Sequence, residues 1–302
     1  MQPFVLGARG SALALRQAEI VCAGLRSASA ARPVAIRAIS ARADEYPDRP
    51  LTAFPGEGIF VKELETALLE RRIDAAVHSL KDLPLDAPGG LCLAAVLVRE
   101  EPRDALVSRS GQPVRDLAAG CRVGTSSLRR RSQLLRMRPD LEMLDIRGNV
   151  DTRLRKLEEG QYDAIVLAAA GLIRLGLRER ITELLGADVM LPEPGQGALA
   201  LEARRDDPDT LKLLGALDHA PTRACVEAER AFLRALGGGC HLPIAALATE
   251  QAGQLDLQGS VTAPDGKRQV RGQMSGSAKD AVALGECLAK QLIAQGALDL
   301  LK

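Results

Sequence analysis

The stretch of sequence that decides the fold is CRVGTSSLRRRSQLLRM, residues 121–137. Its first four residues predict a short strand, TSS predicts a turn with a helix cap, and the remainder has the spacing of a helix. The N-terminal stretch PFVLGARGSALALRQAEIVCAGL, residues 3–25, repeats the order of strand, small polar residues and helix. Strands that alternate with helices predict α/β lobes whose parallel or mixed sheets are covered on both faces.

The chain length of 302 residues exceeds what one hydrophobic core normally supports. Two irregular runs, REEPRD at residues 99–104 and LPEPGQGALALEA at residues 191–203, are predicted crossings between two lobes. Residues 244–273 then alternate polar and apolar side chains, as antiparallel strands do. We therefore expect a discontinuous first α/β lobe of residues 1–98 with 197–216, a second α/β lobe of residues 103–192, and a small C-terminal α+β domain of residues 220–302 with an antiparallel sheet.

Composition excludes several classes of protein. The net charge is +1, aromatic residues make up 2% of the chain and tryptophan is absent, so we expect no nucleic-acid or membrane partner. The six cysteines form no CxxC pair, which indicates reduced thiols, no metal site and a cytoplasmic location. We also expect no secretory signal and no membrane span, because the longest apolar run, residues 164–173, is short.

Arginine is concentrated in residues 121–155, which hold nine arginines and four acidic residues. Such a cluster is either an anion site or a solvated helix face. It follows the TSS turn, where backbone N–H groups and the positive end of a helix dipole favour an anion. Successive helical residues point about 100° apart, so we expect Arg129 and Arg130 to bind the ligand and Arg131 to face solvent. Guanidinium groups bind carboxylates well. A cluster of so many arginines therefore indicates a ligand that carries several carboxylates.

The run HSLKDLP, residues 78–84, is a predicted strand end with one basic and one acidic residue, stopped by proline. It is either a solvated turn or part of a site, because ligands bind at the carboxyl ends of strands in α/β sheets. In a site, Asp82 would be the lone acid among arginines, suited to stabilise a cationic intermediate and to move protons. No hydrolase or nucleotide-binding motif is present.

The glycine triplet in GGGCHLP, residues 237–243, ends a predicted helix and opens a loop. Cys240 follows the triplet directly. From this stretch alone, Cys240 is either a buried structural thiol or a reactive thiol on an open loop.

Nine motifs stand in order along the chain: GARGSALALRQA, GIFVKELE, HSLKDLP, VGTSSLRRR, RGNVDTRL, DAIVLAAAGLIRLGL, PGQGALALE, AERAFLRALGGGC and APDG. In these motifs, almost from end to end, the chain resembles the hydroxymethylbilane synthases, also called porphobilinogen deaminases. The resemblance implies two lobes like those of periplasmic binding proteins, a small third domain and a monomer.

The resemblance also implies a reaction and a cofactor. A dipyrromethane would be bound covalently through a thioether to Cys240. Four porphobilinogen molecules would be joined to it head to tail with loss of ammonia each time, and water would then release linear hydroxymethylbilane. The arginines would bind the acetate and propionate groups of the growing chain.

Individual roles follow from the positions that match the family's motifs. Asp82 would be catalytic, through hydrogen bonds to pyrrole N–H groups and stabilisation of positive charge. The positions that match cofactor-binding residues are Lys81, Thr125, Ser127, Arg129, Arg130 and Arg153. The positions that match substrate-binding residues are Arg9, Ser11, Gln17, Arg147 and Arg174.

One region departs from the family pattern. Where the family has a Thr-x-Gly-Asp-like run, this chain reads ARAD at residues 41–44, and Glu57 stands where a lysine is common. Two other functions fit the residues alone. One is a non-catalytic anion-binding protein of the two-lobe solute-binding type, and the other is an anion-sensing regulatory domain.

Overall fold

The computed structural model describes residues 3–28, 32–40, 61–239 and 242–301. The atypical residues 41–44, Glu57 and Cys240 lie outside these residues. The chain divides into two compact units, Met1–Arg99 with Ala198–Arg223 and Glu100–Gly197 with Ala224–Lys302. The chain therefore passes between units within each of the two irregular runs. The bounds of the three expected domains stay a prediction.

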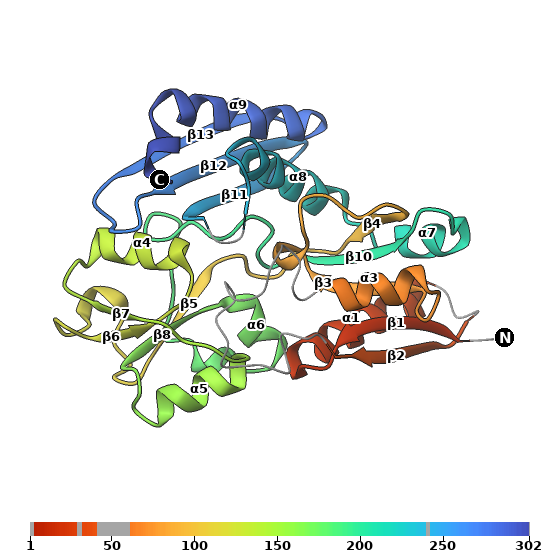
Figure 1. Ribbon diagram of the computed structural model, residues 1–302, viewed down its shortest axis with the longest axis horizontal. Helices are drawn as coiled ribbons and strands as arrows, with labels where there is room; N and C mark the ends of the chain where they lie inside the picture. Colours follow the sequence, from red (N-terminus) through yellow and green to blue (C-terminus); the bar gives the residue numbers. More distant parts are fainter. Residues whose placement is uncertain (1–2, 29–31, 41–60, 240–241, 302) are drawn as a thin grey trace. The chain divides into compact units, whose positions relative to one another are not determined.

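Unit 1 is a five-stranded sheet with helices on both faces (Figure 1). Its elements are β1 (Phe4–Arg9), α1 (Ala12–Ala28), β2 (Val34–Ile39), α3 (Lys62–Leu69), β3 (Ala75–Ser79), the 3₁₀ turn η2 (Leu80–Asp82), β4 (Leu91–Val96), β10 (Leu199–Arg204) and α7 (Pro208–Gly215). The strand order is β2-β1-β3-β10-β4. The first three strands are parallel, and β10 is antiparallel to both of its neighbours.

Unit 1 has a hydrophobic cluster on each face of its sheet, because successive side chains along a strand point to opposite faces. Phe4 and Leu6 are fully buried on the face covered by α1 and α7. On the opposite face, Leu64 and Leu68 of α3 pack against Ala76 of β3. Successive residues of a strand point to opposite faces, so a sheet that is apolar on both faces needs this double cover.

Unit 2 begins with a second sheet of the same design. Its elements are β5 (Asp104–Ser108), β6 (Arg122–Gly124), α4 (Leu128–Met137), β7 (Glu142–Leu144), α5 (Val150–Glu158), β8 (Ala164–Ala168), α6 (Ala169–Arg174) and β9 (Glu183–Leu184). The order is β7-β6-β8-β5-β9, with β6 parallel to β7 and β8, and β5 antiparallel to β8 and β9. Three parallel strands followed by an antiparallel one thus occur in both sheets, which confirms the mixed α/β fold class.

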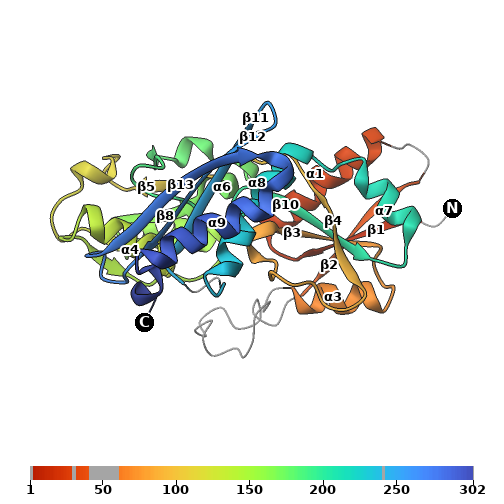
Figure 2. The same ribbon diagram turned by 90° about the horizontal axis from the view of Figure 1, so that it is seen from above.

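The remainder of unit 2 is a three-stranded antiparallel sheet with two helices. Its elements are α8 (Ala220–Ala235), which starts in unit 1, β11 (Ile244–Gln251), β12 (Gln254–Thr262), β13 (Gln269–Ser277) and α9 (Ala281–Ala294). Gly259 and Gly272 lie opposite each other in the ladder. A Cβ on Gly259 would meet Phe232 of α8, and one on Gly272 would meet Leu292 of α9. Both helices therefore cover the same face (Figures 1 and 2), and the expected small antiparallel domain is confirmed.

No helix within the described ranges is long and apolar enough to cross a membrane.

We expect Gly285→Ala to destabilise the contact between α8 and α9. A Cβ at Gly285 would clash with the Ala228 carbonyl oxygen and lie 2.8 Å from the Phe232 nitrogen, both backbone atoms that can shift little. Overpacking of this kind costs about 1–3 kcal/mol, measurable by denaturant unfolding. The matched control is Gly215→Ala in α7, where a Cβ has open space and alanine should be neutral or stabilising by up to ~1 kcal/mol. Equal effects of the two changes would contradict the tight packing of α8 on α9.

Candidate functional site

In unit 1, the predicted substrate-binding residues lie where β1 and β3 end. These two strands are parallel neighbours, so their carboxyl ends share one edge of the sheet. Arg9 is the last residue of β1, and the Ser11 hydroxyl accepts a hydrogen bond from the Ala14 nitrogen (3.3 Å) at the start of α1. Gln17 of α1 is buried, and its Nε2 donates to the Ser79 hydroxyl (3.0 Å) at the end of β3. The sequence analysis did not single out Ser79.

Lys81 and Asp82 follow on the same edge, in the turn η2. The turn is held by Leu80, which is fully buried and whose backbone nitrogen donates to the Ala198 carbonyl (3.0 Å). The Lys81 side chain is half-buried and the Asp82 side chain is exposed. The fold thus fixes the backbone of this turn, on which Asp82 is an exposed residue.

In unit 2, the remaining predicted site residues lie at the matching edge of the second sheet. Thr125 and Ser127 follow β6, and the Ser127 hydroxyl caps α4 by accepting from the Arg130 nitrogen (3.4 Å). Arg147 follows β7, Arg153 lies on α5, and Arg174 ends α6. Because β6, β7 and β8 are parallel, these positions share one edge although they span about fifty residues of sequence.

Arg129 and Arg130 share one buried carboxylate. Arg129 Nη1 donates to Asp104 Oδ2 (2.7 Å), and Arg130 Nε donates to Asp104 Oδ1 (2.9 Å). The exposed fraction is 0% for Asp104, 3% for Arg129 and 6% for Arg130. Burial acts to raise the pKa of Asp104, but the charges of the two guanidiniums and the hydrogen bonds to the carboxylate together hold that pKa well below its usual range. Asp104 therefore stays ionised.

The other three arginines have different surroundings. Arg153 Nε donates to the Gly148 carbonyl (2.8 Å), and Arg174 Nη2 donates to the Gly197 carbonyl (2.6 Å). Burial lowers the pKa of Arg174 to about 10, against an opposing effect of Glu100, so Arg174 is still a cation at neutral pH. The half-buried Arg147 side chain makes no hydrogen bond or ion pair with any residue that the structure describes.

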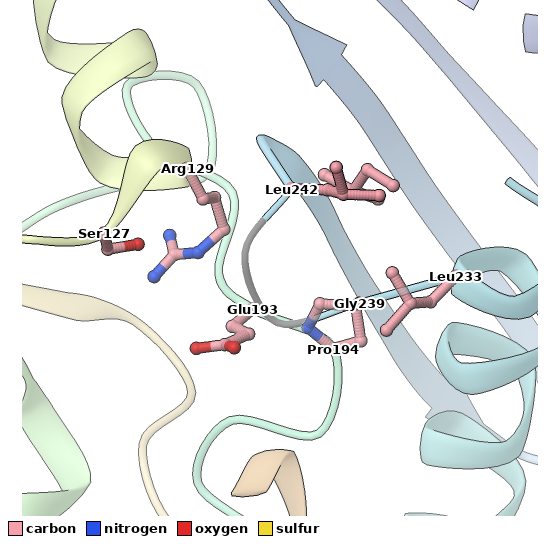
Figure 3. Close-up of a pocket in the computed structure, with 8 residues that line it drawn as sticks. Ser127, Arg129, Glu193, Pro194, Leu233, Gly239 and Leu242 are labelled. Carbon is pink, nitrogen blue, oxygen red and sulfur yellow. The ribbon is translucent and has the colours of Figure 1, made fainter. Parts of the chain in front are cut away.

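A pocket in unit 2 brings part of this set beside the loop of the predicted tether (Figure 3). Its lining consists of Ser127, Arg129, Glu193, Pro194, Leu233, Gly239, Leu242 and Ile244. Gly239 and Leu242 flank Cys240 and His241 in the sequence. The Nε of Arg129 is buried and has no hydrogen-bond partner among the described residues. The lining thus combines a guanidinium with an unused Nε donor, a hydroxyl and the Glu193 carboxylate with the residues that flank Cys240 and His241 in the sequence.

Asp104 and Gln196, which accept from or pack between these arginines, were not predicted from the sequence. Asp104 stands at the end of the charged crossing REEPRD, and Gln196 stands within the second crossing, so neither was singled out. An acid directly before the apolar run ALV was the signal for Asp104, since a charge at the start of a buried strand needs a partner. Glu193, a half-buried carboxylate in the pocket lining, was missed as well.

Comparison with known proteins covers nearly the whole chain. The family model described as porphobilinogen deaminase, dipyromethane cofactor binding domain, matches residues 4–212. The model described as porphobilinogen deaminase, C-terminal domain, matches residues 223–294. The chain belongs to the porphobilinogen deaminase family.

Relatives named porphobilinogen deaminase match over nearly their full length. The relative from Roseiflexus sp. (strain RS-1) is 52% identical over 300 residues, with 99% of each chain covered. The relative from Thermus thermophilus is 49% identical over 303 residues, with 100% of this chain and 99% of the relative covered. Among solved structures, a putative periplasmic sulfonate-binding protein, SsuA from Methylobacillus flagellatus KT, matches with 12% identity and a TM-score of 0.43, covering 76% of this chain and 67% of its own. A likeness at that level carries no inference about what this family member binds.

We expect Asp104→Asn to lower the stability of this porphobilinogen deaminase homologue at neutral pH by about 3–5 kcal/mol, because a buried pair loses one partner. Folding holds the pKa of Asp104 below its unfolded value of about 3.9. The stabilisation is therefore complete above that pH and declines as the pH falls further. Denaturant unfolding should show the difference between wild type and Asp104→Asn narrowing below about pH 4. A difference that stays constant or widens there would contradict this account of the cluster.

Proposed function

We propose that this chain is a hydroxymethylbilane synthase, a transferase of porphyrin and heme biosynthesis. It joins four porphobilinogen molecules head to tail with release of ammonia, and then releases linear hydroxymethylbilane by hydrolysis. The observation that carries the proposal is the sequence identity of 49–52%, over nearly the full chain, with relatives named porphobilinogen deaminase. The two sheet edges, each with arginine and hydroxyl side chains, support it.

The lining of the pocket at Gly239 and Leu242 is chemically suited to one carboxylate of a dipyrromethane cofactor, which we propose is held by a thioether to Cys240. Its lining includes a buried guanidinium nitrogen with no partner among the described residues, and such a donor is stabilised when an anionic group accepts from it. We assign the cofactor to Cys240, Lys81, Thr125, Ser127, Arg129, Arg130 and Arg153. When bound, the dipyrromethane supplies the pyrrole carbon to which the first substrate is joined.

We propose that the substrate is recognised through its carboxylate groups. Porphobilinogen carries an acetate and a propionate, and we assign these groups to Arg9, Ser11, Gln17, Arg147 and Arg174. Arg147 is suited to this role, because its half-buried side chain has no partner among the described residues. A charge-assisted hydrogen bond contributes about 1.5–3 kcal/mol, so two or three of them account for selective binding of a dicarboxylate.

Asp82 is the proposed catalytic residue. Loss of ammonia from porphobilinogen leaves positive charge on the substrate, and a carboxylate about 4 Å away would stabilise that charge by about 4 kcal/mol at an effective dielectric constant of 20. Asp82 is exposed on a turn whose backbone is fixed by Leu80. It can also accept hydrogen bonds from pyrrole N–H groups.

We also propose that the protein works as a monomer in the cytoplasm, with no nucleic-acid or membrane partner and no metal. The near-zero net charge and the scarcity of aromatic residues support the absence of such partners. The spacing of the cysteines supports a reducing compartment.

The tether is tested by intact mass in denaturing solvent. We expect the wild-type protein, incubated with porphobilinogen, to carry an added mass of two linked pyrrole units, and Cys240→Ala to carry none. The control is Cys287→Ala, which removes an exposed thiol on α9 and should keep the adduct. If the wild-type protein carried no adduct, the proposed function would be wrong, and a non-catalytic anion-binding protein would replace it.

The role of Asp82 is tested by Asp82→Asn. We expect turnover of porphobilinogen to fall by at least about 10²-fold, as for loss of a general acid–base group, while the adduct on Cys240 and substrate binding are retained. The control is Asp86→Asn, since Asp86 is another exposed acid in the same loop. Near-native turnover by Asp82→Asn would refute the assigned role.

A further inference from the structure

We propose that Asp104 is a positioning residue for cofactor loading: its carboxylate turns Arg129 so that the Nε N–H of that guanidinium is presented to the pocket lined by Gly239 and Leu242. The inference rests on the proposed function, because it concerns the group that Cys240 would hold. Asp104 itself does not line the pocket, so it acts through Arg129.

The hydrogen bonds of Arg129 leave one direction open. Nη1 donates to Asp104 Oδ2 (2.7 Å) and to the Leu191 carbonyl (2.8 Å), and Nη2 donates to Asp104 Oδ1 (3.3 Å). Both terminal nitrogens are thus anchored, and a guanidinium is planar, so its orientation is fixed. These bonds use three of the five N–H donors of the guanidinium. Of the two that remain, the one on Nε is buried without a partner in the described chain, in a side chain that lines the pocket. Figure 3 shows the guanidinium between Ser127 and the segment of Glu193 and Pro194.

The carboxylate is itself held in place from a third side. Gln196 Nε2 donates to Asp104 Oδ1 (3.0 Å) and to the Pro102 carbonyl (2.8 Å). Arg130 contributes its Nε to the same oxygen, and its Nη1 donates to the Val166 carbonyl (3.1 Å) in β8. Asp104 is therefore the common acceptor of three buried side chains and cannot swing toward another partner.

The net charge of the buried cluster also supports a role for Asp104 in cofactor loading. The buried cluster holds two guanidiniums and one carboxylate, so one positive charge is left without a counter-charge inside it. The two arginines are the second and third residues of α4, where the helix dipole disfavours cations. An unpaired buried donor is costly; the structure has another in Arg204 Nε of unit 1, but Arg129 differs because its side chain lines a pocket. The unused donor at the pocket is what a carboxylate of the cofactor would complete.

The test measures loading and stability side by side. Adduct-free protein is produced in a host that cannot make porphobilinogen, then incubated with porphobilinogen while the intact mass is followed. We expect Asp104→Asn to acquire the adduct at least tenfold more slowly than wild type. We also compare the Tm of each protein after incubation with the Tm of the same protein carrying Cys240→Ser, which cannot load. We expect this Tm difference to be less than half as large in Asp104→Asn as in wild type.

The matched control is Asp163→Asn, the same change in another aspartate–arginine pair of unit 2. Asp163 accepts from Arg122 Nε (3.0 Å) and Nη2 (2.8 Å), immediately before β8 and away from the pocket lining. We expect this variant to lose stability but to load at the wild-type rate. A general loss of stability would slow both variants alike, and that result would overturn the proposal.

A conservative variant keeps the proposal testable if Asp104→Asn does not fold. Asp104→Glu retains the charge but displaces it by one methylene in a fully buried position, so we expect slower loading than wild type and faster loading than Asp104→Asn. Wild-type loading by Asp104→Glu, or by a folded Asp104→Asn, would refute the positioning role. A wild-type protein that never gains an adduct would instead refute the proposed function, so the two failures are distinguishable.

Discussion

One fully buried carboxylate shared by two guanidiniums is the interaction on which the pocket of unit 2 depends. Asp104 begins β5, and the groups bound to it or to its arginines come from α4, β8 and the segment of Leu191 to Gln196. Taking these charges out of water is expensive, and only the mutual attraction and a complete set of hydrogen bonds compensate. The hydrogen bonds and opposite charges around Asp104 offset its desolvation cost, whereas the Nε of Arg129 has no partner among the described residues. The cluster thus holds two guanidiniums and one carboxylate, one positive charge more than it balances.

The repeated sheet design explains why residues far apart in sequence gather at one edge. In both sheets three parallel strands are joined by crossovers. The next strand in each sheet, β10 in unit 1 and β5 in unit 2, is antiparallel to them. Parallel strands require connections that return to the starting edge, so every strand in the set ends on the same side. Polar residues that follow these strands therefore gather at one edge of the sheet. Their position directly after a strand is the only sign of this in the local sequence.

Much of the fold was predictable from local patterns. The strand, turn and helix of residues 121–137 appear as β6, the TSS turn and α4, and the helix predicted to end before the glycine triplet ends at Ala235. Gly237 has a positive φ of 89°, which is why a glycine stands there. The site was less predictable. Two arginines were singled out by their spacing on a helix, but Asp104, which binds both, was hidden in a charged run because its partners lie 25 and 26 residues away.

The sequence by itself determined the fold class, the order of elements, the family and the types of residue available for binding an anion, because periodicity, helix capping and motif order are local properties of a chain. Only the tertiary structure decided what each charged residue does. It buried Arg129 and Arg130 on one carboxylate, left Arg147 without a partner in the described chain and kept Asp82 exposed. The reason is physical: the free energy of a charge depends on burial and on partners within a few ångströms, and folding brings those partners from distant parts of the sequence.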